Sequence, residues 1–182
     1  MVGVGRVRMR RAALAPVAGV LALLAASFAP AGAADGPKGP VTGLPLPRYV
    51  SLKSDRVNLR QGPNKDHATT WVYHRVGLPV EITAEFETWR RVRDSEGVEG
   101  WVLHSLLSGK RTALAAPWEK AAFVPMYREA SETAPLAAKL EPNVIVQVRK
   151  CDKTWCRVEV ARREGFVRQD KLWGVYPGEV VD

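Results

Sequence analysis

The chain has 182 residues, of which 46% are hydrophobic and 25% charged, a balance typical of one or two water-soluble globular domains rather than a disordered chain. Its 15 glycines and 13 prolines favour many turns and short strands over long helices. The formal net charge of +8 includes the four arginines of residues 1–11, so the chain without that segment carries only +4, which argues against a nucleic-acid binder.

The N-terminal segment has the three parts of a secretory signal peptide. Residues 1–11 hold four arginines and no acidic residue, residues 12–30 form an apolar run, and the small residues 31–33 precede a polar turn. An uncleaved membrane anchor is the alternative, but the run is rich in alanine, contains Pro16 and ends at a cleavage-type sequence. We predict that residues 1–33 are removed, so that the mature protein is periplasmic or secreted and is not held in a membrane.

Residues 34–47 form a leader with four prolines and three glycines. Proline cannot donate to a strand ladder, so this composition predicts an extended or flexible segment. The stretch 44–48 also resembles a proline-rich recognition peptide, but a linker is the favoured interpretation.

An internal repeat occupies the rest of the chain. The sequence WRRV at 89–92 recurs as WCRV at 155–158, and GWV at 100–102 recurs as GFV at 165–167. The offset changes from 66 to 65 residues between the two motifs, and such a length change belongs in a hairpin connection. We therefore predict two units, 48–110 and 117–176, with residues 111–116 as the joint.

Each unit shows the alternating pattern of short strands. Val80, Ile82 and Ala84 alternate with polar residues, and residues 144–148 follow the same period of two. Glycines and the Pro142-Asn143 pair punctuate these runs. About five short strands within some 60 residues favour a small, strongly bent barrel, because closure removes unpaired strand edges.

Four motifs of the first unit occur in the order typical of the bacterial SH3-like (SH3b) domain family. They are VNLRQGP at 57–63, GLPVEI at 77–82, TWRRV at 88–92 and GWV at 100–102. The first unit therefore resembles that family. The second unit keeps the Trp155, Val158 and Gly165 positions but has FVPMYR at 123–128 in place of the opening motif, so it is similar to a divergent copy.

The resemblance implies an all-β fold of two tandem SH3-like β-barrels after the signal peptide and leader. It also implies a binding module of the bacterial cell envelope, with peptidoglycan or an envelope protein as the partner. Within the opening motif, Gly62 and Pro63 are expected to shape a turn, which is a structural rather than a binding role.

Catalytic chemistry is not expected. A cysteine nucleophile needs a histidine base close in space, but both cysteines lie in the second unit and all three histidines lie in the first. The chain has no GxSxG, HExxH or phosphate-loop motif, and the histidine spacings do not suit a metal site. We predict a non-enzyme without metal or cofactor.

A repeated tryptophan–arginine pair is the candidate binding feature. Trp89 precedes Arg91, and Trp155 precedes Arg157, by two residues, so each pair shares one face of a strand. With Tyr73 or Tyr127 nearby, such a face can bind a peptide, a sugar or a carboxylate; these six residues are the candidate ligand-binding residues. The alternative is that each tryptophan caps the open end of its barrel and the arginine covers its ring.

Cys151 and Cys156 bracket four residues that can form a hairpin turn. Cross-strand neighbours lie close enough for a disulfide, and an exported protein meets oxidising conditions. At the 66-residue offset the first unit has Glu85 and Arg90 instead, which predicts an ion pair where the second unit has a disulfide.

The sequence thus predicts a non-catalytic exported binding module that recognises peptidoglycan or its peptides. The alternative is a periplasmic protein–protein interaction or regulatory module that does not contact the wall. No nucleic-acid partner is expected, and the sequence leaves the identity of the ligand and the oligomeric state open.

Overall fold

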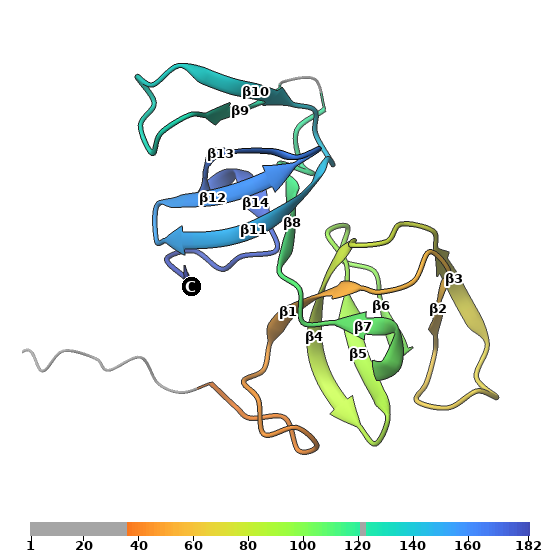
Figure 1. Ribbon diagram of the computed structural model, residues 1–182. Coiled ribbons are helices and arrows are strands. Elements are labelled where there is room, and N and C mark those ends of the chain that lie inside the picture. The colour runs from red at the N-terminus through yellow and green to blue at the C-terminus, as the bar shows by residue number, and fades with distance from the viewer. Residues whose placement is uncertain (1–35, 121–122) are drawn as a thin grey trace, which may run out of the picture. The chain divides into compact units, whose positions relative to one another are not determined.

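A computed structural model of the chain describes residues 36–120 and 123–182. The predicted signal peptide lies outside these residues. The described chain is all-β apart from two short 3₁₀ helices, η1 (His104–Leu106) and η2 (Gln169–Lys171), which confirms the predicted fold class (Figure 1). No helix in these two ranges is long and apolar enough to cross a membrane.

The first sheet has seven strands in the order β3-β2-β6-β5-β4-β1-β7. The strands are β1 (Arg48–Leu52), β2 (Val57–Arg60), β3 (Thr69–Tyr73), β4 (Pro79–Phe86), β5 (Trp89–Arg93), β6 (Glu99–Leu103) and β7 (Leu107–Ser108). Neighbours pair antiparallel, and the long β4 bends by a register shift between Ile82 and Ala84.

The second sheet repeats this topology, with the order β10-β9-β13-β12-β11-β8-β14. Its strands are β8 (Thr112–Ala115), β9 (Val124–Tyr127), β10 (Leu136–Leu140), β11 (Ile145–Asp152), β12 (Trp155–Val160), β13 (Arg163–Arg168) and β14 (Leu172–Trp173). Each strand corresponds to the first-sheet strand seven places earlier, so the repeat read from a few motifs extends to the whole strand order. An added strand, β15 (Val180–Val181), pairs with β11.

The segment predicted as a joint, 111–116, contains β8, which pairs with both β11 and β14. Ala113, Leu114 and Ala115 are buried. This short apolar segment therefore belongs to the second sheet and occupies the place that β1 has in the first.

Each sheet encloses its own apolar core. Equivalent valines lie in both: Val92 and Val102 are buried in the first core, and Val158 and Val167 in the second. The disulfide-bonded cysteines join the second core, where both are almost fully enclosed.

Gly100 and Gly165 explain why both copies keep glycine before their closing motif. A Cβ on Gly100 would lie 2.5 Å from Leu59 Cγ, and one on Gly165 would lie 2.7 Å from the carbonyl oxygen of Tyr127. Strand β2 or β9 thus approaches too closely for any side chain at these positions.

Gly62 differs from the expectation for the opening motif. Its φ is not in the left-handed range; a side chain there would instead meet the ring of His67 at 2.3 Å. Arg60 donates from Nη1 to the carbonyl oxygens of Lys65 and His67, at 2.9 and 2.7 Å. The motif therefore holds the β2–β3 loop together, in line with the structural role assigned to it.

The leader is folded rather than extended or flexible. Gly39 N donates to Leu44 O at 2.8 Å, and Leu46 N donates to Pro37 O at 2.7 Å, which closes residues 37–46 into a loop. The backbone donors of this loop are not prolines, so the high proline content of the leader is compatible with it. Two of its amides, those of Val41 and Thr42, donate to the carboxylate of Glu85 on β4.

Hydrogen bonds also join residues of the two repeats. Thr112 Oγ1 donates to Gly77 O at 2.7 Å, and Tyr176 Oη donates to Glu81 Oε1 at 2.8 Å. Burial, with the hydrogen bond to Glu81, raises the pKa of Tyr176, so its hydroxyl remains a donor. The described residues of both repeats, 36–120 and 123–182, accordingly belong to one compact unit.

Candidate functional site

In the first barrel the predicted pair does not form an open site. Trp89 is only 6% exposed, although Arg91 on the same strand is exposed and pairs with Glu99 at 2.6 Å. Tyr73 is also buried and donates to Asp94 at 2.9 Å, in a different cleft from the one that Trp89 lines. Trp89 is therefore enclosed, but Arg91 pairs with Glu99 rather than covering its ring, so only the burial of the tryptophan agrees with the alternative interpretation.

In the second barrel the predicted aromatic residues do meet. The ring of Trp155 is half-buried and lies 5.7 Å from the ring of Tyr127, edge to face at 86°. This geometry is favoured between aromatic rings because the positive edge of one meets the negative face of the other. Trp155 is only half-buried, so the residue is not fully enclosed.

The cation beside Trp155 is Arg168 rather than Arg157. The Arg168 guanidinium lies 5.8 Å from the Trp155 ring centre, because the two residues pair directly across β12 and β13. Arg157 instead forms an ion pair with Glu164, with Nε 3.0 Å from Oε2. Sequence spacing along one strand could not identify Arg168, whereas aligning the hairpin strands would have found it.

Arg168 also has two carboxylate partners. It donates to Glu132 Oε1 at 3.0 Å and to Asp170 Oδ1 at 3.2 Å. Together with Tyr127, Pro125 and Lys171, these residues line a small cleft of about 170 Å³. We call Tyr127, Trp155 and Arg168 the Trp155 face.

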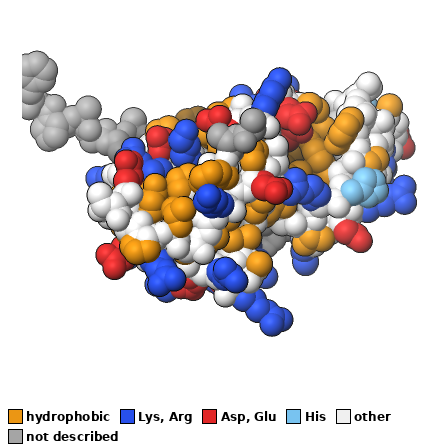
Figure 2. Space-filling model, turned by 90° about the horizontal axis from the view of Figure 1, so that it is seen from above, with side chains coloured by type: hydrophobic (Ala, Val, Ile, Leu, Met, Phe, Trp, Pro, Cys, Tyr) orange, Lys and Arg blue, Asp and Glu red, His pale blue; other side chains and the backbone are white. Residues whose placement is uncertain are grey.

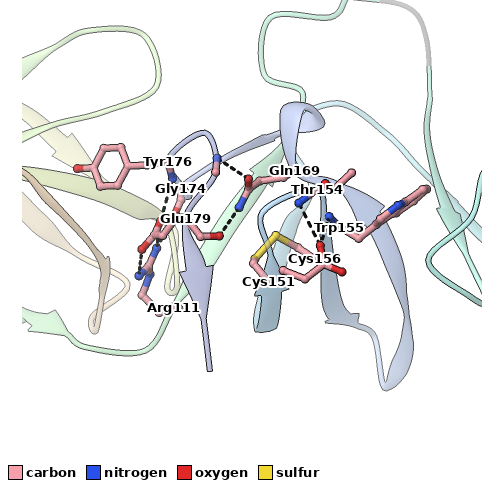
Figure 3. Close-up of a disulfide and its surroundings, with 11 residues drawn as sticks. Arg111, Cys151, Thr154, Trp155, Cys156, Gln169, Gly174, Tyr176 and Glu179 are labelled. Atoms are coloured by element: carbon pink, nitrogen blue, oxygen red, sulfur yellow. Dashed lines mark hydrogen bonds and ion pairs between the residues drawn. A yellow bond between two sulfur atoms is a disulfide. The ribbon is translucent and has the colours of Figure 1, made fainter. Parts of the chain in front are cut away.

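The disulfide hairpin positions Trp155, the central residue of the Trp155 face (Figure 3). Cys151 and Cys156 are bonded, with their Cα atoms 4.1 Å apart. Asp152 Oδ1 accepts hydrogen bonds from the amides of Thr154 and Trp155, at 3.0 and 2.8 Å, which lowers the pKa of Asp152. The turn that carries Trp155 is thus fixed by a covalent bond and a carboxylate, with the ring pointing away from the disulfide.

Charges of both signs are mixed over the surface, as Figure 2 shows for one face. Many arginines are paired with carboxylates, among them Arg91, Arg149, Arg157 and Arg168. This mixing leaves no large basic field on the face that Figure 2 shows, and long-range steering of a polyanion would need such a field.

Metal ligands do not converge within the described ranges, where no group of three or more His, Cys, Asp and Glu side chains could hold an ion. The predicted site residues thus provide aromatic faces and arginine donors. Such groups suit recognition of a ligand by stacking and hydrogen bonding.

Comparison with known families identifies the repeat. The family described as "Bacterial SH3 domain" matches residues 53–109 and again residues 120–174. The chain belongs to the bacterial SH3 domain family. The two bent sheets are therefore two tandem SH3 domains, and both the predicted family and the tandem arrangement are confirmed.

Other comparisons are more distant, and no curated protein sequence matches the chain. Two similar solved structures are NlpC2 and NlpC1 from Trichomonas vaginalis, at 13% and 15% identity, TM-score 0.32 each. They cover 70% and 69% of this chain and 48% and 45% of their own lengths. An NlpC/P60 family protein from Bacillus cereus matches at 13% identity and TM-score 0.28, covering 69% of this chain and 55% of its own. The chain spans about half the length of these structures.

Proposed function

We propose that the protein is a non-catalytic, exported binding module of the bacterial cell envelope that recognises peptidoglycan or its peptides. The observation that carries the proposal is the Trp155 face. It combines a partly exposed tryptophan, on a hairpin closed by a disulfide, with a tyrosine of β9 and an arginine of β13. Family membership supports the class of binding module, and the signal-like residues 1–33 support export to the periplasm or beyond.

Chemistry supports peptidoglycan as the ligand. The stem peptides of peptidoglycan carry carboxylates. Arg168 already binds a surface carboxylate of the protein itself, that of Glu132, whose side chain is 63% exposed. An exposed ion pair contributes only about 0–1 kcal/mol, so a ligand carboxylate can replace Glu132 at low cost. The planar guanidinium then offers two parallel donors while Trp155 packs against the rest of the ligand.

Cosedimentation with purified, protein-free sacculi tests the proposal. We expect the mature protein to pellet with sacculi and the Trp155→Ala variant to bind at least about tenfold more weakly, as expected for loss of one stacking side chain. Trp71→Ala is the matched control, because Trp71 is 56% exposed in the first barrel and lies outside the Trp155 face. A mature protein that stays in the supernatant overturns the proposal.

A second candidate function is protein–protein interaction in the periplasm without wall contact. Its supporting observation is that Trp71 and Val98 are both exposed and line the same cleft, which has a volume of about 390 Å³. Tyr73 and Leu78 also contribute to the lining of this cleft. Exposed apolar residues gathered at one cleft are typical of interaction sites. Failure to bind sacculi, together with an envelope protein crosslinked through position 71, would favour this function.

A further inference from the structure

A second cleft, which none of the predicted site residues identified, adjoins the Trp155 face. Its volume is about 480 Å³, and its apolar wall is built from Tyr49, Trp118, Trp173 and Pro177. Arg168 and Asp170 line its polar side, so it is continuous with the Trp155 face. We call it the aromatic cleft. Its volume lies within the range of about 300–1,000 Å³ usual for small-ligand sites.

The wall of the aromatic cleft is preformed. The ring of Tyr49 lies 5.2 Å from that of Trp173, edge to face at 75°, and 4.6 Å from that of Tyr176. Burial, with the nearby charge of Glu81, raises the pKa of Tyr49 to about 12, so its hydroxyl stays neutral at physiological pH. A ligand therefore meets rings that are already held in place.

The loop beside these rings is held as firmly. The Gln169 side chain accepts a hydrogen bond from Gly178 N and donates one to Glu179 O, both at 2.8 Å. Glu179 in turn accepts two hydrogen bonds from Arg111, at 2.8 and 3.0 Å (Figure 3). These hydrogen bonds hold the loop of residues 174–179, from which Val175, Pro177 and Gly178 line the cleft.

Trp118 is the accessible ring of the aromatic cleft. It is 52% exposed, although a tryptophan in a soluble domain normally buries most of its surface. With Trp173 in the same cleft, it offers a flat apolar face to a ligand that enters.

Charge decides which ligand suits the aromatic cleft. Arg168 is balanced by Asp170, and Lys153 at the rim has no ion pair within residues 36–120 and 123–182. The lining side chains thus carry a net charge of only +1, that of Lys153, while Asp170 and Thr154 supply hydrogen-bonding oxygens. This combination suits a neutral ligand with many hydroxyl or amide groups.

We infer that the aromatic cleft binds the glycan strand of peptidoglycan, a chain of N-acetylated amino sugars, with Trp118 stacked on a sugar ring. One face of a pyranose ring presents C–H groups, which are apolar and slightly positive and so pack on the negative face of an indole ring. The sugar hydroxyl and acetamido groups can then bond to Asp170 and Thr154. The inference rests on the proposed function and assigns the sugar to the aromatic cleft, beside the peptide carboxylate at Arg168.

The test uses the mature, disulfide-bonded protein and two probes. The first is a soluble N-acetylglucosamine hexamer, titrated by calorimetry and by tryptophan fluorescence. We expect saturable binding that Trp118→Ala weakens by at least about tenfold. Trp71→Ala, which removes an equally exposed tryptophan outside the aromatic cleft, should leave the affinity unchanged. Trp118 is exposed, so an unchanged melting temperature of its variant verifies the fold.

Peptidoglycan provides the second probe in two forms, intact sacculi and the soluble glycan strands that an amidase releases by removing the stem peptides. The cross-links run through the stem peptides, so the peptide-free strands do not pellet and their binding is measured by calorimetry. Binding of the free strands that Trp118→Ala weakens by at least about tenfold supports the inference. Pelleting with intact sacculi without binding of the free strands overturns the inference and leaves the proposed function intact. Failure to bind either form overturns both the proposed function and the inference. Binding of the free strands should change little between about 0.05 and 0.5 M salt, because screening weakens only charge-driven binding; a steep fall also contradicts the inference.

Discussion

Glu85 and Arg90 face each other across the β4–β5 hairpin, at the position that Cys151 and Cys156 occupy in the β11–β12 hairpin. Arg90 Nε lies 3.5 Å from Glu85 Oε1, and both side chains are almost completely buried. The ion pair expected from the repeat is therefore present, and the two barrels close the same hairpin by different chemistry.

The charge of Glu85 has a consequence that the disulfide lacks. Glu85 accepts hydrogen bonds from the amides of Val41 and Thr42, at 3.0 and 2.9 Å, from Thr42 Oγ1 at 2.6 Å and from Arg48 at 2.7 Å. A buried carboxylate needs such donors, and the leader supplies most of them. We call this set of contacts the leader clamp.

The second barrel covers the same hairpin without a charge. There β15 pairs with β11, with Val181 opposite Cys151 and Val180 opposite Asp152. The C-terminal strand thus covers the hairpin of the second barrel by backbone pairing, whereas the leader clamp covers the equivalent hairpin of the first barrel.

Removing the disulfide should destabilise the second barrel. A double Cys151→Ser, Cys156→Ser variant is expected to lose about 2 kcal/mol of unfolding free energy, since the bridge closes a loop of only a few residues. Denaturant titrations of wild type with and without a reductant, followed by tryptophan fluorescence, measure the loss. The variant itself should not respond to the reductant, and equal midpoints for oxidised and reduced wild type would contradict the prediction.

Breaking the leader clamp should release residues 36–47. In Glu85→Gln the neutral amide offers the leader amides and Arg48 a much weaker acceptor, so the leader should become sensitive to proteolysis while the barrel stays folded. Limited proteolysis with mass spectrometry detects this change. Glu99→Gln is the matched control, because Glu99 pairs with Arg91 in an exposed pair worth about 0–1 kcal/mol. A leader that is cleaved equally fast in wild type and Glu85→Gln would show that the clamp does not hold it.

The leader clamp should also be sensitive to acid. Burial alone would raise the pKa of Glu85, but the hydrogen bonds from Thr42, Arg48 and Val41 outweigh it and lower the pKa from 4.5 to about 2. Because the folded-state pKa is depressed, the clamp stabilises the protein fully above about pH 4.5, by on the order of 3 kcal/mol, and this contribution is lost as the pH falls toward 2.

Unfolding midpoints of wild type and Glu85→Gln, compared at intervals from pH 7 to pH 2, measure the pH effect. We expect the difference between the two proteins to be constant down to about pH 4.5 and to vanish near pH 2. A difference that remains at pH 2 would show that ionisation of Glu85 is not its source.

The repeated glycines should tolerate no side chain. Gly100→Ala and Gly165→Ala place a methyl group within 2.9 Å of backbone or core atoms, so each should cost roughly 1–3 kcal/mol through displaced strands. Thermal melts report the loss. Gly109→Ala is the control, since a Cβ there meets no atom within 4 Å; a control as damaging as the other two would refute the steric explanation.

The sequence by itself determined the all-β class, the repeat and the pairing of Cys151 with Cys156. These features follow from local and periodic properties: alternating apolar residues, a constant offset, and two cysteines that flank one turn. The same offset predicted the Glu85–Arg90 ion pair, because these two residues occupy the hairpin positions equivalent to Cys151 and Cys156.

Only the tertiary structure decided which aromatic rings are accessible. Trp89 and Trp155 occupy equivalent positions in the sequence, yet one is buried and the other half-exposed, because burial depends on neighbours far along the chain. Arg168 reaches Trp155 across a strand pair, and Tyr49 joins Trp118 and Trp173 in the aromatic cleft from about 70 and 124 residues away. The composition of the leader also gave a wrong prediction, because its four prolines indicate an extended or flexible segment. In the structure, the leader amides of Val41 and Thr42 bind the carboxylate of Glu85, which only the folded first barrel positions.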